Sequence, residues 1–257
     1  MQPKISIVTI TFNSEKTLER TIQSVISQDY ENVEYIIVDG ASNDKTLDII
    51  KSYADKGITS WISEPDKGIS DAFNKGISLA TGEIIGIINS DDGLEAGALR
   101  AVAEAYEPDV DVYRGNIYFW NTDSGAKIRE VPSMSFPFSK QVNISHQGTF
   151  VAKAAYEKYG VFNVDYKYSM DYDILLRFEK AGAKFKYVDA TLAYFTIGGL
   201  TFTSYSSERR KETETIMRSH GAKPWHIWRF RILKYTKNFI KKHVNIDLLL
   251  RLRHRKD

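Results

Sequence analysis

Cysteine is absent from the 257 residues of the chain. Its absence excludes disulfide scaffolds, zinc sites built from thiolates and cysteine nucleophiles. A cytoplasmic location is therefore the expectation, because structural disulfides are a feature of secreted proteins. The N-terminus agrees, since a single lysine and the short apolar stretch Ile5–Ile10 do not form the pattern of a secretory signal.

Long apolar runs are missing as well. The longest is Ile84–Ile88, so no segment is expected to span a bilayer. Apolar residues nevertheless make up 42% of the chain and prolines number only 6, which is ordinary for a globular protein with a substantial core. We therefore expect a protein that is soluble or bound to a membrane surface.

The chain also has little net charge, because 35 Lys and Arg balance 33 Asp and Glu to a formal +2. This balance argues against a nucleic-acid coat protein. The charge is unevenly placed, however. From Glu208 onward there are 15 Lys and Arg against 5 Asp and Glu, whereas the first 207 residues have 20 against 28. These counts predict an acidic body at residues 1–205 and a basic tail at residues 206–257.

Apolar strands and amphipathic helices alternate over the first 90 residues. The predicted strands are Lys4–Ile10, Val33–Val38, Ile58–Ser63 and Glu83–Ile88. The predicted helices between them are Ser14–Gln28, Asp44–Tyr53 and Ile69–Ala80. This alternation is typical of right-handed crossovers, so it predicts an α/β fold with a mostly parallel central sheet and helices on both faces.

Polar side chains gather where the predicted strands end, which in such a sheet is the edge that faces the ligand. They are Thr9, Thr11, Asn13, Asp39, Glu64, Asp66, Asn89, Ser90, Asp91 and Asp92. Each alone is equally well explained as a helix cap or turn residue. The adjacent Asp91 and Asp92, however, would repel each other unless a cation or another compensating group lies nearby. Oxygen ligands without a Cys or His cluster suit Mg²⁺ or Mn²⁺ shared with substrate phosphates.

Four stretches in this order resemble family 2 glycosyltransferases of the GT-A fold. They are residues 6–13, 36–46, 66–76 and 81–92, within a resemblance that covers approximately residues 3–200. The resemblance is to bacterial enzymes that build O-antigen, capsule and other surface polysaccharides. It implies a catalytic domain at 1–205, with a nucleotide-binding half at 1–95 and an acceptor half at 96–205. It also implies a non-processive, inverting enzyme that uses nucleotide-diphospho-sugars.

The resemblance assigns residues to the donor pocket. Asp39 would accept a hydrogen bond from the imide N–H of a uracil or thymine base, and Thr9, Thr11 and Asn13 would line the same pocket. Asp66 and Lys75 are further donor-site candidates, Lys75 at the diphosphate. The alternative for Lys75 is an ordinary solvated lysine on a helix surface.

The metal site takes the place of the family's Asp-x-Asp motif. The corresponding sequence, residues 89–92, lacks the first acid of that motif. Asp91 and Asp92 are therefore both candidate ligands of Mn²⁺ or Mg²⁺. We expect Asp92 to be the main ligand, with Asp91 directed toward the ribose or the donor sugar.

The catalytic base is expected in a Glu-Asp pair that opens a helix in the second half of the family's domain. Here Met170 stands where the Glu is expected, and Asp171 is the candidate base. The alternatives are that Asp171 only caps the helix Tyr172–Lys180, or that Asp173 is the base or an acceptor-binding residue. His146 is a candidate for contact with the diphosphate or the acceptor, although a lone histidine beside apolar residues is more often structural.

The tail predicts a basic amphipathic helix. Its apolar residues recur at steps of three and four: Trp225, Trp228, Ile232, Tyr235 and Phe239. Basic residues fill most of the remaining arc, which suits the surface of an anionic membrane. The alternatives are that the apolar stripe docks on the catalytic body or on a second subunit, as in a homo-oligomer. The tail contains no recognised nucleic-acid module, so no nucleic-acid partner is expected.

Together these features predict a metal-dependent transferase that moves a sugar from a nucleotide-diphospho-sugar, with UDP favoured, to a lipid-linked saccharide at the cytoplasmic face of the inner membrane. One alternative is a sugar-phosphate nucleotidyltransferase, although a glycine-rich basic loop after the first strand is missing. The other is a non-catalytic partner in polysaccharide assembly that retains the fold, suggested by the missing first acid of residues 89–92 and by Met170.

Overall fold

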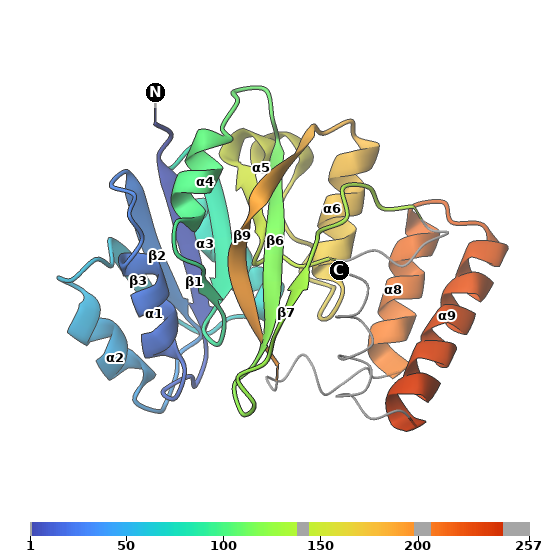
Figure 1. Ribbon diagram of the computed structural model, residues 1–257, viewed down its shortest axis with the longest axis horizontal. Coiled ribbons are helices and arrows are strands. Elements are labelled where there is room, and N and C mark those ends of the chain that lie inside the picture. Colours follow the sequence, from blue (N-terminus) through green and yellow to red (C-terminus); the bar gives the residue numbers. More distant parts are fainter. Residues whose placement is uncertain (1, 138–143, 198–206, 244–257) are drawn as a thin grey trace.

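The computed structural model describes residues 2–137, 144–197 and 207–243, with side chains as far as residue 233. A curved central sheet is covered by helices on both faces (Figure 1). Its strand order is β3-β2-β1-β4-β8-β6-β9-β5, and β7 pairs with β6 outside this path. The boundary predicted at residue 205 and the end of the tail lie outside the described residues.

The first half of the chain forms the parallel part of the sheet. Its strands are β1 (Ile5–Thr11), β2 (Val33–Asp39), β3 (Ser60–Ser63) and β4 (Ile84–Asn89), connected by α1 (Leu18–Ile26), α2 (Thr46–Tyr53) and α3 (Ile69–Leu79). All pairings among these four strands are parallel. The predicted succession of strands and helices is thus confirmed, although α1 begins four residues later than expected.

The second half adds strands of mixed direction. These elements are β5 (Gly93–Leu94), α4 (Ala98–Glu104), β6 (Val112–Asn121), β7 (Lys127–Glu130), β8 (Thr149–Ala152), α5 (Lys153–Tyr159), α6 (Met170–Lys180) and β9 (Phe185–Ile197). β8 lies antiparallel between β4 and β6, while the long β9 runs parallel to β6. The sheet is therefore parallel in the first half of the chain and mixed in the second half.

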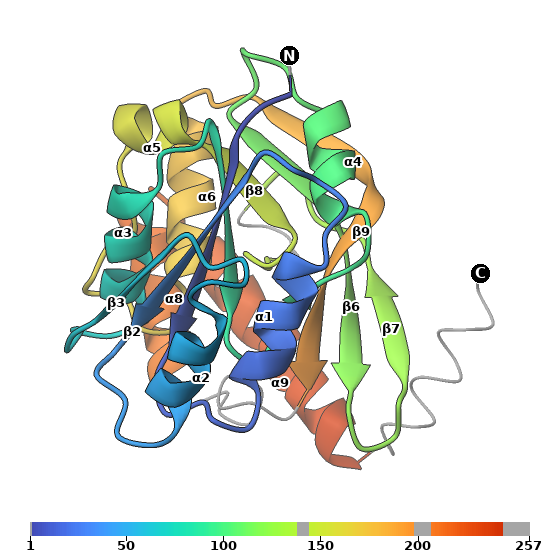
Figure 2. The same ribbon diagram turned by 90° about the vertical axis from the view of Figure 1, so that its left-hand side faces the viewer.

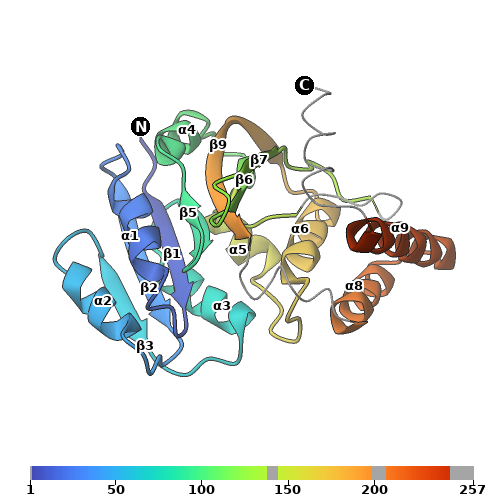
Figure 3. The same cartoon turned by 60° about the horizontal axis from the view of Figure 1, so that its bottom comes forward.

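Alternating apolar residues divide the core into two layers. Ile7 and Ile37 pack toward α1, α2 and α4, whereas Val8, Ile36 and Val38 pack toward α3, α5 and α6 (Figures 2 and 3). Successive strand residues point to opposite faces, so these strands must be apolar on both sides. This explains why they appear in the sequence as nearly continuous apolar runs.

The tail begins as two helices, α8 (Ser207–Ser219) and α9 (Pro224–His243), beside α6 and on the side of the molecule away from α2 (Figures 1 and 3). Arg231 of α9 donates two hydrogen bonds to Glu214 of α8, of 2.8 and 2.5 Å. Among the described helices, none is long and apolar enough to cross a membrane. The side chains of Tyr235 and Phe239 lie outside the described residues.

Candidate active site

The strand ends form one acidic edge, which we define as Asp39 and residues 89–92. Strand register aligns Thr11 with Asp39, and the hydroxyl groups of Ser14 and Ser90 are 2.7 Å apart. The loop after β1 is thereby joined to the loop after β4. The acids that follow different strands thus lie at the same edge of the sheet.

Asp39 at the end of β2 is fully buried. One carboxylate oxygen accepts a hydrogen bond of 2.5 Å from the Ser42 hydroxyl. The other accepts bonds from the Ser63 hydroxyl at 2.6 Å and from the Ser42 backbone N–H at 3.0 Å. Because a carboxylate has about four acceptor positions, one position remains for an incoming N–H. Ser42 and Ser63 were not predicted from the sequence.

Three side chains lie against the residues that follow Asp39. Phe12 is 60% exposed, which is unusual for a large aromatic residue. Asn13 has the left-handed φ of 48° and accepts a bond of 2.9 Å from the Asn43 N–H. Asp66 packs so closely on Gly40 that a Cβ at that glycine would lie 2.5 Å from the Asp66 carboxylate. The structure therefore brings Asn13 and Asp66 to the predicted pocket, and it adds Phe12.

Two predicted donor residues have other partners. Thr9 is fully buried, and its hydroxyl lies 3.1 Å from the Tyr35 hydroxyl. Lys75 donates to Glu64 and to the Pro65 carbonyl, each at 2.8 Å. Lys75 thus binds the loop that precedes its own helix.

Thr11 is buried with no hydrogen-bond partner for its hydroxyl among the described residues.

Asp92 is the more enclosed of the two adjacent acids. It is fully buried, and its carboxylate accepts bonds from Gln147 at 2.7 Å and from the Thr196 N–H at 2.9 Å. Burial, together with the charge of Asp91, raises the pKa of Asp92 to about 7. Asn89 Nδ2 donates a third bond of 3.3 Å, so one of the about four acceptor positions of the Asp92 carboxylate remains open.

The Asp91 carboxylate is less enclosed than that of Asp92. Its backbone carbonyl accepts bonds from Arg20 at 2.9 Å and from the Thr196 hydroxyl at 2.6 Å. Its partly exposed carboxylate accepts no hydrogen bond from another residue in the described part of the chain. The Asp91 carboxylate is therefore the more open of the two candidate metal ligands predicted from the sequence. Arg20 and Thr196 were not predicted from the sequence, whereas Gln147 lies in residues 144–150, a stretch that resembles the family, but had no role assigned to it.

His146 and Asp171 form a pair beside this edge. The Nδ1 atom of His146 lies 2.8 Å from one carboxylate oxygen of Asp171. The remaining atoms, His146 Nε2 and Asp171 Oδ1, are buried and have no partner among the described residues. Burial alone would lower the pKa of His146, but the charges of Asp171, Asp92 and Asp91 raise it. A protonated His146 is therefore favoured by three nearby carboxylates.

Asp171 does not act as a helix cap. The helix α6 begins at Met170 with Ser169 in the N-cap position, so Asp171 lies within the first turn. One of its oxygens goes to His146, and the other has no partner within the described residues. The interpretation of Asp171 as only a cap therefore finds no support.

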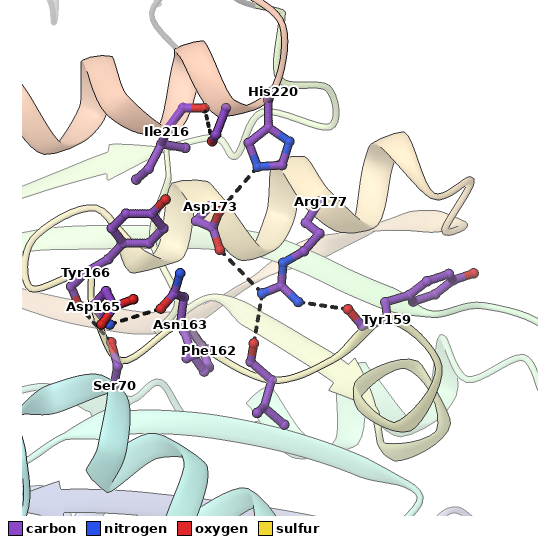
Figure 4. A network of polar contacts seen from close by, with 12 residues as sticks. Ser70, Tyr159, Phe162, Asn163, Asp165, Tyr166, Asp173, Arg177, Ile216 and His220 are labelled. Carbon is purple, nitrogen blue, oxygen red and sulfur yellow. Dashed lines mark hydrogen bonds and ion pairs between the residues drawn. The ribbon is translucent and has the colours of Figure 1, made fainter.

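Asp173 is not brought together with these groups. It is buried between α6 and α8, where it pairs with Arg177 at 3.4 Å and with His220 at 3.2 Å (Figure 4). Two residues along a helix turn by about 200°, so Asp171 and Asp173 point in nearly opposite directions. The position of Asp173 indicates a structural ion pair in place of the predicted base or acceptor-binding role.

A metal ion would have to be shared with a substrate. In the described part of the chain, no three His, Asp or Glu side chains come together as a complete metal site. Mg²⁺ and Mn²⁺ commonly bind through one or two carboxylates and substrate phosphates, so no such group is needed. The Asp91 carboxylate and the buried, unpaired Oδ1 of Asn89 are oxygen donors of the preferred kind. The residues present therefore fit an ion held jointly with a diphosphate.

Comparison with known proteins identifies relatives over most of the chain. The model of glycosyl transferase family 2 matches residues 6–161. A PGL/p-HBAD biosynthesis glycosyltransferase of Mycobacterium bovis is 31% identical over 217 residues, which is 80% of this chain and 82% of the relative. An uncharacterized glycosyltransferase of Mycobacterium tuberculosis is 32% identical over 184 residues, 68% of each chain.

Two solved structures share the fold at low sequence identity. Residues 1–349 of S. aureus TarS in complex with UDP-GlcNAc align with a TM-score of 0.66 and 19% identity, covering 95% of this chain and 77% of TarS. The mannosyltransferase PcManGT from Pyrobaculum calidifontis, in complex with GDP-Man and Mn²⁺, aligns with a TM-score of 0.66 and 15% identity. That alignment covers 100% of this chain and 80% of PcManGT. These likenesses agree with the GT-A fold expected from the sequence.

Proposed function

The chain belongs to glycosyl transferase family 2, and we propose that it is an inverting, non-processive, metal-dependent glycosyltransferase. It transfers a sugar from a nucleotide-diphospho-sugar, with UDP favoured, to a hydroxyl of a lipid-linked saccharide in surface polysaccharide synthesis. One observation carries the proposal. The consecutive residues His146 and Gln147 hydrogen-bond to Asp171 and Asp92, so the candidate base and the acidic edge flank one short segment.

The donor assignment is supported by the acidic edge and by the two structural relatives. The free acceptor position of Asp39 suits the imide N–H of uracil, and the exposed Phe12 ring nearby offers a face on which a base can stack. TarS and PcManGT were solved with UDP-GlcNAc and with GDP-Man and Mn²⁺, respectively. Mn²⁺ or Mg²⁺ would be held by Asp91, with Asn89 nearby, and when bound it supplies Lewis-acid stabilisation of the departing diphosphate.

The transfer step uses Asp171 as general base. The acceptor hydroxyl gives its proton to the Asp171 carboxylate while its oxygen forms a bond to the anomeric carbon. The bond from that carbon to the diphosphate oxygen breaks, and its electron pair leaves with the nucleoside diphosphate. Attack on the face opposite the leaving group inverts the configuration. His146 holds one oxygen of Asp171 through Nδ1 and leaves Oδ1 for the acceptor.

The direct test is a thermal-shift panel with UDP-GlcNAc, UDP-glucose, dTDP-glucose and GDP-mannose, each with Mn²⁺ or with EDTA, followed by analysis of the products. We expect a uridine donor to stabilise the protein only with Mn²⁺ and to release UDP. Formation of pyrophosphate from a nucleoside triphosphate and a sugar 1-phosphate would instead identify a nucleotidyltransferase. Binding of donors without any turnover would favour the non-catalytic alternative.

Asp171→Asn separates chemistry from binding. Removal of a general base typically costs about 10²- to 10⁴-fold in rate, so turnover should fall by that order while donor binding stays unchanged. The readouts are the rate of nucleotide release and the donor-induced thermal shift. Loss of donor binding in this variant would mean that Asp171 is misassigned.

We further propose that the protein attaches peripherally to an anionic membrane through α9, at the cytoplasmic face of the inner membrane. Support comes from two exposed aromatic residues of this helix, since Trp225 and Trp228 are 52% and 65% exposed. Ile227 of the same helix is buried, at 2% exposed. The two tryptophans offer an apolar surface that suits a membrane interface, and a second subunit is the alternative partner.

A further inference from the structure

The segment that leads into the base-bearing helix is held by a single carboxylate from the tail. Glu212 of α8 accepts hydrogen bonds from three consecutive backbone N–H groups, those of Lys167 at 2.8 Å, Tyr168 at 2.8 Å and Ser169 at 2.6 Å. Successive N–H groups that converge in this way form a nest, which favours a bound anion. We propose that Glu212 is a positioning residue that sets the location of Asp171, an inference that rests on the proposed role of Asp171 as base.

The start of α6 depends on α8 because it has no cap of its own. Ser169 occupies the N-cap position but makes no side-chain capping bond, and its hydroxyl lies 2.8 Å from the Thr213 hydroxyl. Asp171 is only two residues beyond the nest. A shift in the backbone of residues 167–169 would therefore move the Asp171 carboxylate.

Other contacts fix the same region from both sides. Upstream, Ser70 of α3 donates a bond of 2.9 Å to the carbonyl of Tyr166 (Figure 4). Downstream, Asp173 of α6 pairs with His220, and the fully buried Ile216 of α8 belongs to the core cluster that includes α6 (Figure 4). Residues 167–169 lie between these anchors, and Glu212 accepts bonds from all three of their backbone N–H groups. The carboxylate thus fixes the backbone of the segment that leads to Asp171.

The expected consequence is kinetic. Displacement of a catalytic group by about 1 Å can lower a rate by about 10²-fold without affecting substrate binding. The donor residues Asp39 and Asp91 belong to the other half of the molecule and have no contact with Glu212. Loss of the Glu212 carboxylate should therefore reduce the rate of the chemical step and leave the donor site intact.

The experiment compares Glu212→Ala and Glu212→Gln with the matched control Glu208→Gln. Glu208 lies one turn earlier on α8 and accepts only a 3.1 Å bond from the Tyr168 hydroxyl. The readouts are kcat and KM for hydrolysis of the donor that gives the largest thermal shift in the panel above, with Mn²⁺, and the melting temperature. We expect kcat of Glu212→Ala to fall about 10- to 100-fold with KM unchanged, Glu212→Gln to be intermediate, and Glu208→Gln to match the wild type.

A double variant shows whether Glu212 acts through Asp171. In the Asp171→Asn background, Glu212→Ala should cause no further loss of kcat, because the group that it positions is already removed. An equal further loss would overturn the inference, as would a wild-type kcat in Glu212→Ala. If Glu212→Ala does not fold, the same cycle with Glu212→Gln decides. An unchanged rate in Asp171→Asn alone would instead refute the proposed base, whatever Glu212 does.

Discussion

At the scale of single residues, the two adjacent acids after β4 differ in what surrounds them. Protein donors hold both oxygens of Asp92, whereas the Asp91 carboxylate accepts no bond from another described residue. An unpaired carboxylate beside a buried one is unfavourable for folding. Burial raises the pKa of Asp91, and burial together with the charge of Asp91 raises the pKa of Asp92. Such a cost is commonly retained where a site must bind a cation.

Asp91→Asn tests this difference. Mn²⁺-dependent turnover should fall by roughly 100-fold or more, in line with the loss of an electrostatic group at the leaving diphosphate. The melting temperature without donor should stay the same or rise, because the substitution removes repulsion and breaks no hydrogen bond from another residue. Kinetics and thermal melting of the variant check both parts. Full activity with Mn²⁺, or a melting temperature lower by several degrees, would contradict the assignment.

Glu34 gives a prediction about stability and pH. This buried residue accepts bonds from Ser6 at 2.5 Å and from Thr81 at 2.7 and 2.8 Å, and it pairs with Lys4. Burial alone would raise its pKa, but these hydrogen bonds outweigh burial and lower the pKa from 4.5 to about 2. Because the folded value is lower, the ionised group stabilises the fold above the unfolded pKa, and this stability is lost as the pH falls toward 2.

Glu34→Gln should therefore lower the free energy of unfolding by about 2 kcal/mol at pH 7 and by much less near pH 3. Urea unfolding at both pH values measures the difference, with the exposed Glu31→Gln as control. A deficit that is the same at pH 3 and pH 7 would show that the charge of Glu34 is not responsible.

Sequence reasoning located the acids of the site but not their partners. Asp39, Asp91 and Asp92 could be predicted because each follows an apolar strand, and parallel strands end at one edge. The roles of Ser63, Gln147 and Arg20 could not, because these roles depend on contacts between segments that are distant in the chain. Gln147, for example, reaches Asp92 across 55 positions of sequence.

At the scale of elements, α3 packs closely against the sheet because Gly76 has no side chain at the point of contact. A Cβ at Gly76 would lie 2.1 Å from a methyl group of Val8, which is fully buried in β1. Gly76→Ala should destabilise the fold by about 1 to 3 kcal/mol through overpacking, despite the better helix propensity of alanine. Chemical unfolding measures this cost, and the exposed Ser78→Ala on the same helix should change stability by less than about 0.5 kcal/mol. An equal effect of both substitutions would argue against this packing.

The elements of the first half were predictable and those of the second half less so. The first four strands are apolar runs bounded by polar residues, so the pattern of apolar residues in the sequence is sufficient to predict them. β9 was not predicted, because Lys186 and Asp189 interrupt its pattern and its pairing partner β6 lies about 70 residues earlier, with an irregular register at Gly115 and Asn116. Long-range pairing of this kind leaves little local signal in the sequence.

At the scale of the whole molecule, the exposed aromatic residues of α9 give a test of membrane attachment. The double variant Trp225→Ala with Trp228→Ala should lose most binding to vesicles with anionic lipid, since interfacial tryptophans and basic residues act together there. Co-sedimentation with vesicles of phosphatidylglycerol and phosphatidylcholine measures it, and Val164→Ala serves as an exposed apolar control. If the double variant instead converts a dimer to a monomer in sedimentation analysis, the partner is a second copy.

The helical pair α8 and α9 also limits how parts of related enzymes can be exchanged. Glu214 ties α9 to α8 through Arg231, while Glu212 ties α8 to residues 167–169. A chimaera that joins residues 1–197 to the helical pair of a relative would inherit the surface affinity of that relative. It would reach the full rate of turnover only if the new pair also offered an acid at the position of Glu212. Target membrane and catalytic competence would therefore be inherited together in such exchanges.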